Sequence, residues 1–252
     1  LLGQGVVAKF DPATYSDAIA FARIGEGSLG GKARGLAFMN SMLVKYCQYA
    51  KYENVRVTIP RTVVVATDYF DAFIRNNGLE YVLTTEMTDE EILSEFVSST
   101  LPYKLREALK AYVRTVSGPL AVRSSSKLED SHYQPFAGIY STYMIPYTEG
   151  NEDRQLRLLQ KAIKSVYAST YFAASKAYVQ SSQNLIAEEK MAVVIQEVCG
   201  TEQDGLFFPT LSGVARSINY YPIGDETPEE GVCNIALGLG KLVVDGGRTL
   251  RF

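Results

Sequence analysis

The sequence predicts an α+β fold rather than a doubly wound sheet. Apolar residues recur at helical spacing in several segments between residues 33 and 180, and strand-like runs rich in β-branched residues fill the last third. The chain has 252 residues, 46% of them hydrophobic, which is enough to bury a core as one large domain or as two lobes. Because the helices come early and the strands late, we do not expect a regular alternation of strand and helix.

The N-terminal half contains four predicted helices that are separated by turn signals. They span residues 33–46, 69–77, 88–97 and 103–116. The first follows the pair Gly30-Gly31, and the second stops at Gly78. Thr88 and Glu91 have the spacing of a capping box, which starts the third helix, and Gly118-Pro119 ends the fourth.

The predicted strands are short apolar runs bounded by turn residues, and a fifth, long helix over 152–180 interrupts them. Strands are expected at residues 55–59, 62–66, 120–123, 139–145, 191–198, 212–221, 232–236 and 242–244. The first two flank Pro60 and could form one broken strand. An acidic, turn-rich stretch, residues 223–231, is the expected flexible tract.

Composition excludes several classes of protein. A formal net charge of −3 argues against a nucleic-acid partner, so any phosphate site must be local. No run approaches eighteen apolar residues, and the first ten residues lack the layout of a signal peptide, so we expect a cytoplasmic protein without a membrane span. Cys47, Cys199 and Cys233 lie far apart, which favours free buried thiols. The chain starts at Leu1 without a methionine and is expected to be part of something longer.

The stretch LAVRSSSKLEDSHYQPFAGIYSTY, residues 120–143, indicates phosphate handling. Arg123 offers a planar fork of donors at the end of an apolar strand, and Ser124, Ser125 and Ser126 add hydroxyl and backbone donors. The glycine of Phe136-Ala137-Gly138 would let a second backbone segment approach closely. The alternative is a surface arginine followed by a serine-rich turn, and these residues alone leave both open.

A second candidate is GSLGGKARGLAFM, residues 27–39, in which glycines precede a predicted helix. Backbone amides at a helix N-terminus attract anions, and Lys32 adds a positive charge. It is not a Walker A motif, because no Ser or Thr follows the lysine. A glycine-rich turn with a solvated lysine is the alternative.

Two later segments and one histidine complete the candidates. MAVVIQEVCG, residues 191–200, becomes polar at Gln196 and Glu197, which suits an adenine edge or a ribose, or is an ordinary buried strand. ALGLGKLVVDGG, residues 236–247, carries Lys241 between glycines that tight turns explain equally well. His132 is the sole histidine of the sequence, which excludes a multi-histidine metal site.

In order along almost the whole chain, these segments resemble the N-terminal nucleotide-binding domain shared by pyruvate phosphate dikinase and phosphoenolpyruvate synthase, an ATP-grasp-type fold. GGKARGLAFM is similar to the family's GGKGxNLAxM, and IPRTVVVATDYFDAFI to its PPGFVIT segment with the following helix. LAVRSSSKLEDSHYQPFAGIYSTY matches VAVRSSATxEDxxxxSFAGxxxT. MAVVIQEVCG resembles VxVQxMV, LSGVARS resembles SGVxFT, and LGLGKLVVDGG resembles GLGExVVxG.

The resemblance implies an ATP-dependent phosphotransferase domain with ATP between two lobes, an N-terminal lobe over 1–118 and a strand-rich lobe over 119–252. The catalytic pair would be Lys32 and Arg123, both on the phosphates. The implied nucleotide-binding residues are Lys32, Arg123, Ser124, Ser125, Gly138, Gln196, Glu197 and Val198, the last three beside the adenine. In the full enzymes the phosphoryl group passes to a histidine of a separate domain and then to pyruvate in another, so both partners are expected elsewhere in the protein.

Two departures from the family pattern bear on catalysis. Lys241 stands where the family has an acidic residue after GLG, and Ile218 stands where relatives have an arginine, with Arg216 two places early. Phosphoryl transfer normally needs Mg²⁺, and Asp225 or Glu226 are the expected metal ligands, unless residues 223–231 are simply a solvated acidic loop.

These departures keep two alternatives open. One is a catalytically impaired ATP-grasp module that senses nucleotides or mediates an interaction. The other is a dikinase domain that serves another acceptor, such as a glucan or an antibiotic.

Overall fold

A computed structural model describes residues 7–16, 18–46, 52–126, 140–181, 190–245 and 247–252. The chain forms two compact units, Leu1–Val198 and Cys199–Phe252, which we call unit 1 and unit 2. Sequence reasoning placed its two lobes on either side of residue 118, whereas strands from both sides of that position belong to one sheet of unit 1. The compact units therefore divide the chain at a different place.

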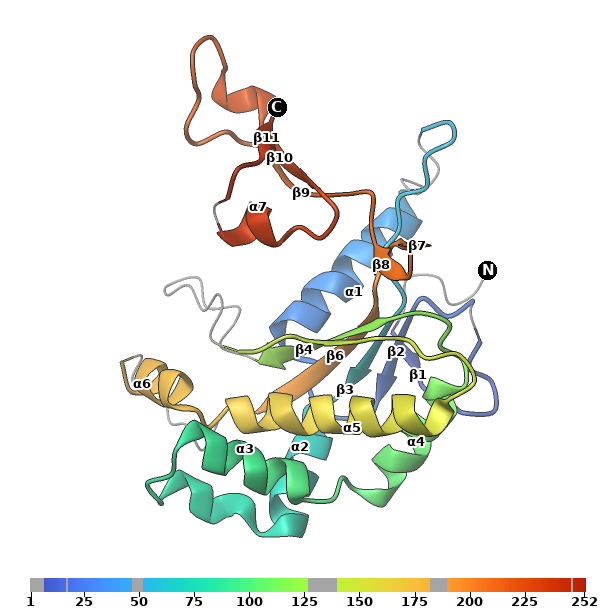
Figure 1. Ribbon diagram of the computed structural model, residues 1–252, viewed down its shortest axis with the longest axis vertical. Coiled ribbons are helices and arrows are strands. Elements are labelled where there is room, and N and C mark those ends of the chain that lie inside the picture. The colour runs from blue at the N-terminus through green and yellow to red at the C-terminus, as the bar shows by residue number, and fades with distance from the viewer. Residues whose placement is uncertain (1–6, 17, 47–51, 127–139, 182–189, 246) are drawn as a thin grey trace. The chain divides into compact units, whose positions relative to one another are not determined.

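Unit 1 is built on a mixed sheet of six strands in the order β1-β2-β3-β6-β4-β5 (Figure 1). The strands are β1 (Ala8–Lys9), β2 (Phe21–Ile24), β3 (Thr62–Val65), β4 (Leu120–Ser126), β5 (Tyr143–Ile145) and β6 (Met191–Glu197). The pairs β1–β2 and β2–β3 are parallel, and the pairs β3–β6, β6–β4 and β4–β5 are antiparallel. The strand β6 thus joins the parallel half of the sheet to the antiparallel half.

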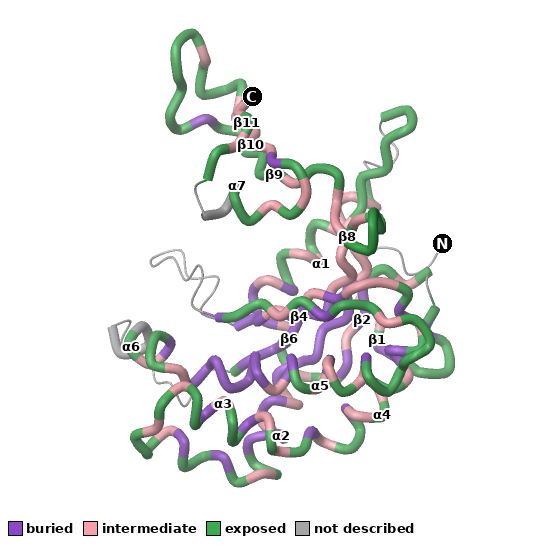
Figure 2. Tube along the Cα trace, in the orientation of Figure 1, coloured by how far each residue is buried: buried purple, intermediate pink, exposed green. Residues whose placement is uncertain are grey.

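Helices cover both faces of this sheet, as Figures 1 and 2 show. The helices of unit 1 are α1 (Gly30–Lys45), α2 (Thr67–Asn77), α3 (Asp89–Ser98), α4 (Tyr103–Val113), α5 (Glu152–Ser169) and α6 (Ala173–Ser181), with a 3₁₀ helix, η2, at Leu79–Leu83. Val64 and Val194 pack in one buried cluster with Ala33 of α1, whereas Val63 and Val193 belong to the larger cluster that includes residues of α2 to α5. This alternation gives the sheet an α1 face and an opposite face.

Local signals fix several ends of these helices as the sequence predicts. Thr88 and Glu91 form the expected capping box, with the Glu91 amide donating to Thr88 Oγ1 over 3.2 Å and the Thr88 amide donating to the Glu91 carboxylate over 2.8 Å. Gly78 ends α2 in the left-handed conformation, at φ 61°. The long predicted helix over 152–180 is divided into α5 and α6.

Unit 2 contains a hairpin and a small antiparallel sheet. The hairpin joins β7 (Thr201–Gln203) to β8 (Leu206–Phe208) through Asp204 and Gly205, both with positive φ, as a tight hairpin turn requires. The three-stranded sheet has the order β11-β10-β9, with β9 at Leu211–Arg216, β10 at Val232–Leu237 and β11 at Leu250–Arg251. A 3₁₀ helix, η5 (Pro228–Glu230), precedes β10, and the short helix α7 (Lys241–Asp245) follows it.

The α+β class is confirmed, and four strand predictions are corrected. Residues 55–59 form no strand, because Val55 and Val57 are exposed and their segment makes one isolated bridge, between Tyr52 and Val55. Residues 242–244 lie in α7, since β10 already pairs with β9 on one side and β11 on the other. The strand expected at 212–221 ends at Arg216, and of the strand expected at 139–145, β5 forms over Tyr143–Ile145 while residue 139 lies outside the described residues.

Candidate functional site

The first turn of α1 lies directly against the backbone of β4. Gly30 has φ +70°, and a Cβ atom placed on it would stand 1.9 Å from the carbonyl oxygen of Ser125. A residue with a side chain would be strained at this positive φ. Its Cβ atom would also overlap the carbonyl oxygen of Ser125. Gly30 therefore allows a close approach of two backbones, which the sequence analysis did not predict for this segment.

Hydrogen bonds connect the GGK segment to the serines that follow Arg123. The Ser125 hydroxyl donates to the carbonyl oxygen of Leu29 over 2.8 Å and accepts from the amide of Ala33 over 3.1 Å. Lys32 Nζ donates to Ser124 Oγ over 3.1 Å. The structure thus brings together two candidate segments that are more than ninety residues apart in the sequence.

Arg123 lies half-buried on the α1 face of the sheet. It is the Cα partner of Val194 across the β4–β6 pair, and Val194 packs with Ala33 of α1. Opposite residues of antiparallel strands project to the same face, so Arg123 shares a face with the helix that carries Lys32. Two basic residues, Arg123 and Lys32, therefore stand on elements that meet on one face of this sheet.

The segment before α1 is held by the start of α2, a feature that the sequence reasoning missed. Asp68 accepts hydrogen bonds from the amides of Glu26, at 3.1 Å, and Gly27, at 3.0 Å. The Thr67 hydroxyl accepts from the Ser28 amide at 2.9 Å, and the Thr67 amide donates to the Ser28 carbonyl oxygen at 3.0 Å. The available signal was the pair Thr67-Asp68 at a helix start, where such side chains commonly accept from backbone amides.

The Glu26 side chain connects the segment before α1 to strands β1 and β2. Its carboxylate forms ion pairs with Lys9 of β1 at 2.7 Å and with Arg23 of β2 at 2.9 Å. The hydrogen bond from Lys9 and the charge of Arg23 hold the pKa of Glu26 below its usual range. Arg23 also donates to the carbonyl oxygen of Gly25 over 3.1 Å.

The predicted adenine-side residues stand at the end of β6. Gln196 is the Cα partner of Ala121 and of Thr62, lies on the α1 face like Arg123, and donates from Nε2 to Thr62 Oγ1 over 3.1 Å. Val198 donates its amide to the Pro119 carbonyl oxygen over 3.0 Å. Because successive side chains of a strand alternate, Glu197 points to the opposite face.

On that opposite face, Glu197 forms a largely buried ion pair with Arg61. Arg61 Nε donates to Glu197 Oε1 over 2.7 Å, Nη2 donates to the same oxygen, and Nη2 also reaches the Thr115 carbonyl oxygen at 2.6 Å. The side chain of Arg61 is 10% exposed and that of Glu197 is 26% exposed. The Glu197 carboxylate thus connects β6 to Arg61, before β3, and Arg61 in turn reaches the segment after α4. The sequence analysis did not assign this role to Glu197.

The predicted metal ligands lie in unit 2, and Glu226 is engaged by other groups there. Its carboxylate accepts from Arg251 Nη2 at 2.7 Å, from Asn219 Nδ2 at 2.7 Å and from the Ile223 amide at 3.0 Å. The hydrogen bond from Arg251 is the main reason that the pKa of Glu226 falls to about 2. Asp225 beside it is exposed.

A cation at Glu226 would have to displace the Arg251 guanidinium from its carboxylate. No cluster of three or more His, Cys, Asp or Glu suited to metal binding occurs within the described ranges. The pair Asp225 and Glu226 as magnesium ligands stays a prediction.

The two residues that depart from the family pattern also lie in unit 2. Arg216 and Ile218 line a cavity of about 390 Å³ together with Asn219, Tyr220, Tyr221 and Arg251, among others. Lys241 begins α7 and is exposed.

Gly138, His132 and Cys47 lie outside the described residues. The two cysteines that are described are free thiols, as predicted, but neither is buried: Cys199, which follows the end of β6, is exposed, and Cys233 is half-buried.

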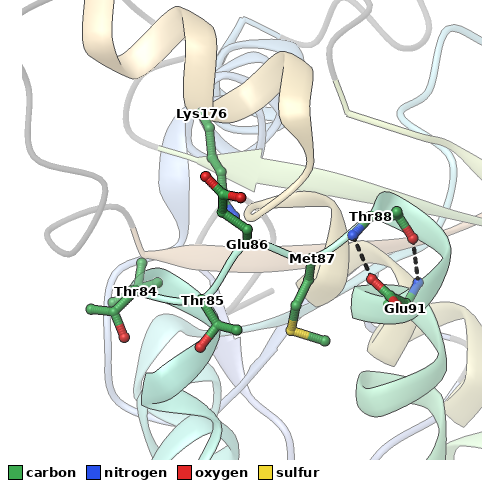
Figure 3. A pocket seen from close by; sticks show the side chains of 8 residues that line it. Thr84, Thr85, Glu86, Met87, Thr88, Glu91 and Lys176 are labelled. Carbon is green, nitrogen blue, oxygen red and sulfur yellow. Dashed lines mark hydrogen bonds between the residues drawn. The ribbon is translucent and has the colours of Figure 1, made fainter.

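A second cavity occurs in unit 1, and none of the candidate residues lines it. It has a volume of about 520 Å³ and is lined by Leu83, Thr84, Thr85, Glu86, Met87, Thr88, Glu91 and Lys176. Figure 3 shows its polar side chains and the capping box of α3 at one side. None of the predicted phosphate-binding or adenine-binding residues is among those that line it, so we do not assign the nucleotide to it.

In the part of the chain that the structure describes, no helix is long and apolar enough to cross a membrane. The matching family model is described as "Pyruvate phosphate dikinase, AMP/ATP-binding domain" and covers residues 26–250. This range contains every candidate residue named above, from Lys32 to Lys241.

Two curated proteins are similar to this chain. An uncharacterized phosphotransferase, YvkC, from Bacillus subtilis is 31% identical over 198 residues, which is 76% of this chain and 20% of that protein. A phosphoenolpyruvate synthase from Aeropyrum pernix is 28% identical over 240 residues, which is 86% of this chain and 25% of that protein. The chain thus spans a fifth to a quarter of the length of these relatives.

Proposed function

Because this chain belongs to the pyruvate phosphate dikinase AMP/ATP-binding domain family, we propose that it is the ATP-binding part of a phosphotransferase similar to phosphoenolpyruvate synthase. Lys32 and Arg123 contact the phosphates of ATP in this proposal. The observation that carries it is the contact between the start of α1 and β4. There, Gly30 allows backbone approach and Lys32 bonds to Ser124, next to Arg123.

The chemistry of these residues suits a polyphosphate. The first amides of a helix have no partner in the preceding turn, and the helix dipole adds favourable potential for an anion at that end. Lys32 supplies a point charge, and Arg123 supplies a fork that matches two phosphate oxygens. Ser124 already accepts from Lys32, so a bound phosphate would compete for that ammonium or share it.

The adenine is assigned to the end of β6. Gln196, on the same face as Arg123, is the side chain best placed to meet a base at that end, and Val198 follows at the exit from the sheet. Glu197 would contribute through its backbone, because its carboxylate is bonded to Arg61. Ser124, Ser125 and Gly138 stay proposed as nucleotide-binding residues.

The reaction we propose is phosphoryl transfer from ATP to a histidine on a separate domain, which would pass the group on to pyruvate. The bond between the transferred phosphorus and the nucleotide oxygen breaks, and a phosphorus–nitrogen bond forms on the acceptor imidazole. Lys32 and Arg123 would stabilise the negative charge on the oxygens during this exchange. The relatives are four to five times longer than the part matched here, which leaves room for both acceptor domains.

A second candidate function is nucleotide binding without turnover. It is favoured by the positive side chain of Lys241 in place of an acid and by the engagement of Glu226 with Arg251. Saturable ATP binding by a protein that transfers no phosphoryl group to histidine, with or without Mg²⁺, would identify this function.

Calorimetric titration of the intact protein with ATP, with and without Mg²⁺, tests the proposal. We expect Lys32→Ala and Arg123→Ala each to weaken ATP binding by about 10- to 100-fold, the range for a hydrogen bond to a charged group. Matched controls are Lys45→Ala, in the last turn of the same helix, and Arg114→Ala, an exposed arginine paired with Glu152. Equal affinity in the wild type and both site variants would refute the assignment.

A further inference from the structure

The backbone around the Glu26–Ser28 segment lies so close to the start of α2 that two of its positions leave no room for a side chain. A Cβ atom on Gly27 would lie 2.6 Å from the Asp68 amide nitrogen, and one on Gly25 would lie 2.5 Å from Asp68 Oδ1. Gly25 also has φ +100°. Two glycines are therefore required for one carboxylate to accept from two consecutive amides, which indicates a segment fitted to Asp68 rather than a chance surface contact.

The support behind Asp68 is rigid. Phe70 and Phe73 of the same helix are 3% and 0% exposed, and their rings pack against Tyr167 of α5 with centroids 5.1 and 5.5 Å apart. Interiors packed in this way deform little. Packing in the core thus holds the first turn of α2 in place. The hydrogen bonds of Asp68 in turn hold the segment before α1 against this turn.

A continuous series of bonds leads from Asp68 to the proposed phosphate ligands. Ser28, which is bonded to Thr67, accepts from the Gly30 amide through its hydroxyl over 3.3 Å. Leu29 then accepts from Ser125, and Lys32 follows within the first turn of α1. A displacement of Glu26–Ser28 would therefore move the start of the helix on which Lys32 stands.

We propose that Asp68, assisted by Thr67, is a positioning residue that fixes the Glu26–Ser28 segment and thereby the place of Lys32 against the phosphates of ATP. This inference rests on the proposed function. Asp68 touches no phosphate itself and acts through the backbone of the segment. Loss of the Asp68 carboxylate should weaken ATP binding, because part of the binding free energy is then used to order Lys32.

The test compares Asp68→Ala and Asp68→Asn with Asp71→Ala in the whole protein. Asp71 lies on the same helix, and its carboxylate pairs with Lys190 at the surface. Asparagine keeps one acceptor but turns an N–H donor toward the second amide, so its effect should be intermediate. We expect amide hydrogen exchange at Glu26 and Gly27 to accelerate by at least about tenfold in Asp68→Ala and less in Asp68→Asn, with no change in Asp71→Ala.

ATP affinity supplies the readout that a merely structural role would not move. We expect Asp68→Ala to weaken ATP binding by about tenfold in the wild-type background and by less than about twofold in Lys32→Ala, because Asp68 acts through Lys32. Unchanged affinity in Asp68→Ala, or an equal loss in both backgrounds, would overturn the inference while the wild type still binds. Absence of ATP binding by the wild type would overturn the proposed function and this inference with it.

Discussion

At the scale of single residues, Gly30 carries the closest contact of the candidate site. Its positive φ and its distance from Ser125 leave no room for a side chain, because the atom in the way belongs to the backbone of a central strand and cannot rotate aside. Gly35, one and a half turns further along α1, has open space around it. The same helix therefore offers one glycine that the fold requires and one that it does not.

We expect Gly30→Ala to lower the free energy of unfolding by more than about 2 kcal/mol, since it combines a left-handed alanine with an overlap against backbone. Gly35→Ala should raise it by about 0.5–1 kcal/mol, because alanine is the better helix former. Denaturant titration of both variants measures the difference. A Gly30→Ala protein as stable as the wild type would show that α1 and β4 are not held this closely.

The sequence identified Lys32, Arg123 and the serines as candidates, but not which atoms meet. Glycines before a helix and an arginine at a strand end are local patterns, and local patterns can be read directly. The bonds of Ser125 to Leu29 and Ala33 depend on how α1 packs across β4, which no spacing along the chain encodes. Asp68 was missed for the same reason, since its partners lie about forty residues earlier.

At the scale of elements, prediction succeeded where a segment carried its own start and stop signals. The capping box of α3 and the glycine after α2 are both confirmed. It failed where neighbours decide the conformation. Val55 and Val57 have strand propensity but no adjacent strand within the described residues, and Leu242 to Val244 follow a strand whose two edges are already occupied.

In unit 2, Glu226 and Arg251 join the segment between β9 and β10 to the edge strand β11. The folded-state pKa of Glu226, about 2, lies below the usual 4.5 of the unfolded chain. This group therefore contributes stability that is fully present above about pH 4.5 and is lost as the pH falls toward about 2.

We expect part of the acid-induced loss of stability between about pH 4.5 and about pH 2 to disappear in Glu226→Gln. Glu229→Gln, an exposed neighbour, is the control and should keep the wild-type acid dependence. Denaturant unfolding of each variant across this pH range measures it. An identical acid dependence in the wild type and Glu226→Gln would contradict the ion pair.

At the scale of the whole molecule, the six-stranded sheet and both buried hydrophobic clusters belong to unit 1. All the strand pairings of β1 to β6 and the two buried clusters built on that sheet lie within residues 1–198. Family motifs give an order along the chain but not the partners of a strand. The α+β class could be predicted, whereas the mixed sheet could not.

We expect a fragment of residues 1–198 to fold by itself, with cooperative thermal unfolding and the far-ultraviolet dichroism of a mixed α and β protein. A fragment of residues 1–190, which lacks β6, is the control and should not unfold cooperatively, because β3 and β4 then lose their shared neighbour. Gradual, non-cooperative melting of the 1–198 fragment would mean that unit 1 depends on the rest of the chain.

The position of β6 in the sheet has a consequence for biosynthesis. This strand occupies the middle of the sheet but is the last of its six strands to be translated, more than 120 residues after β3. While the ribosome is still making α5 and α6, β3 and β4 each expose an unpaired edge, and such edges invite association with other chains. No nascent polypeptide that ends before Glu197 can contain the complete sheet, so the facing edges of β3 and β4 are filled only after β6 has been synthesised.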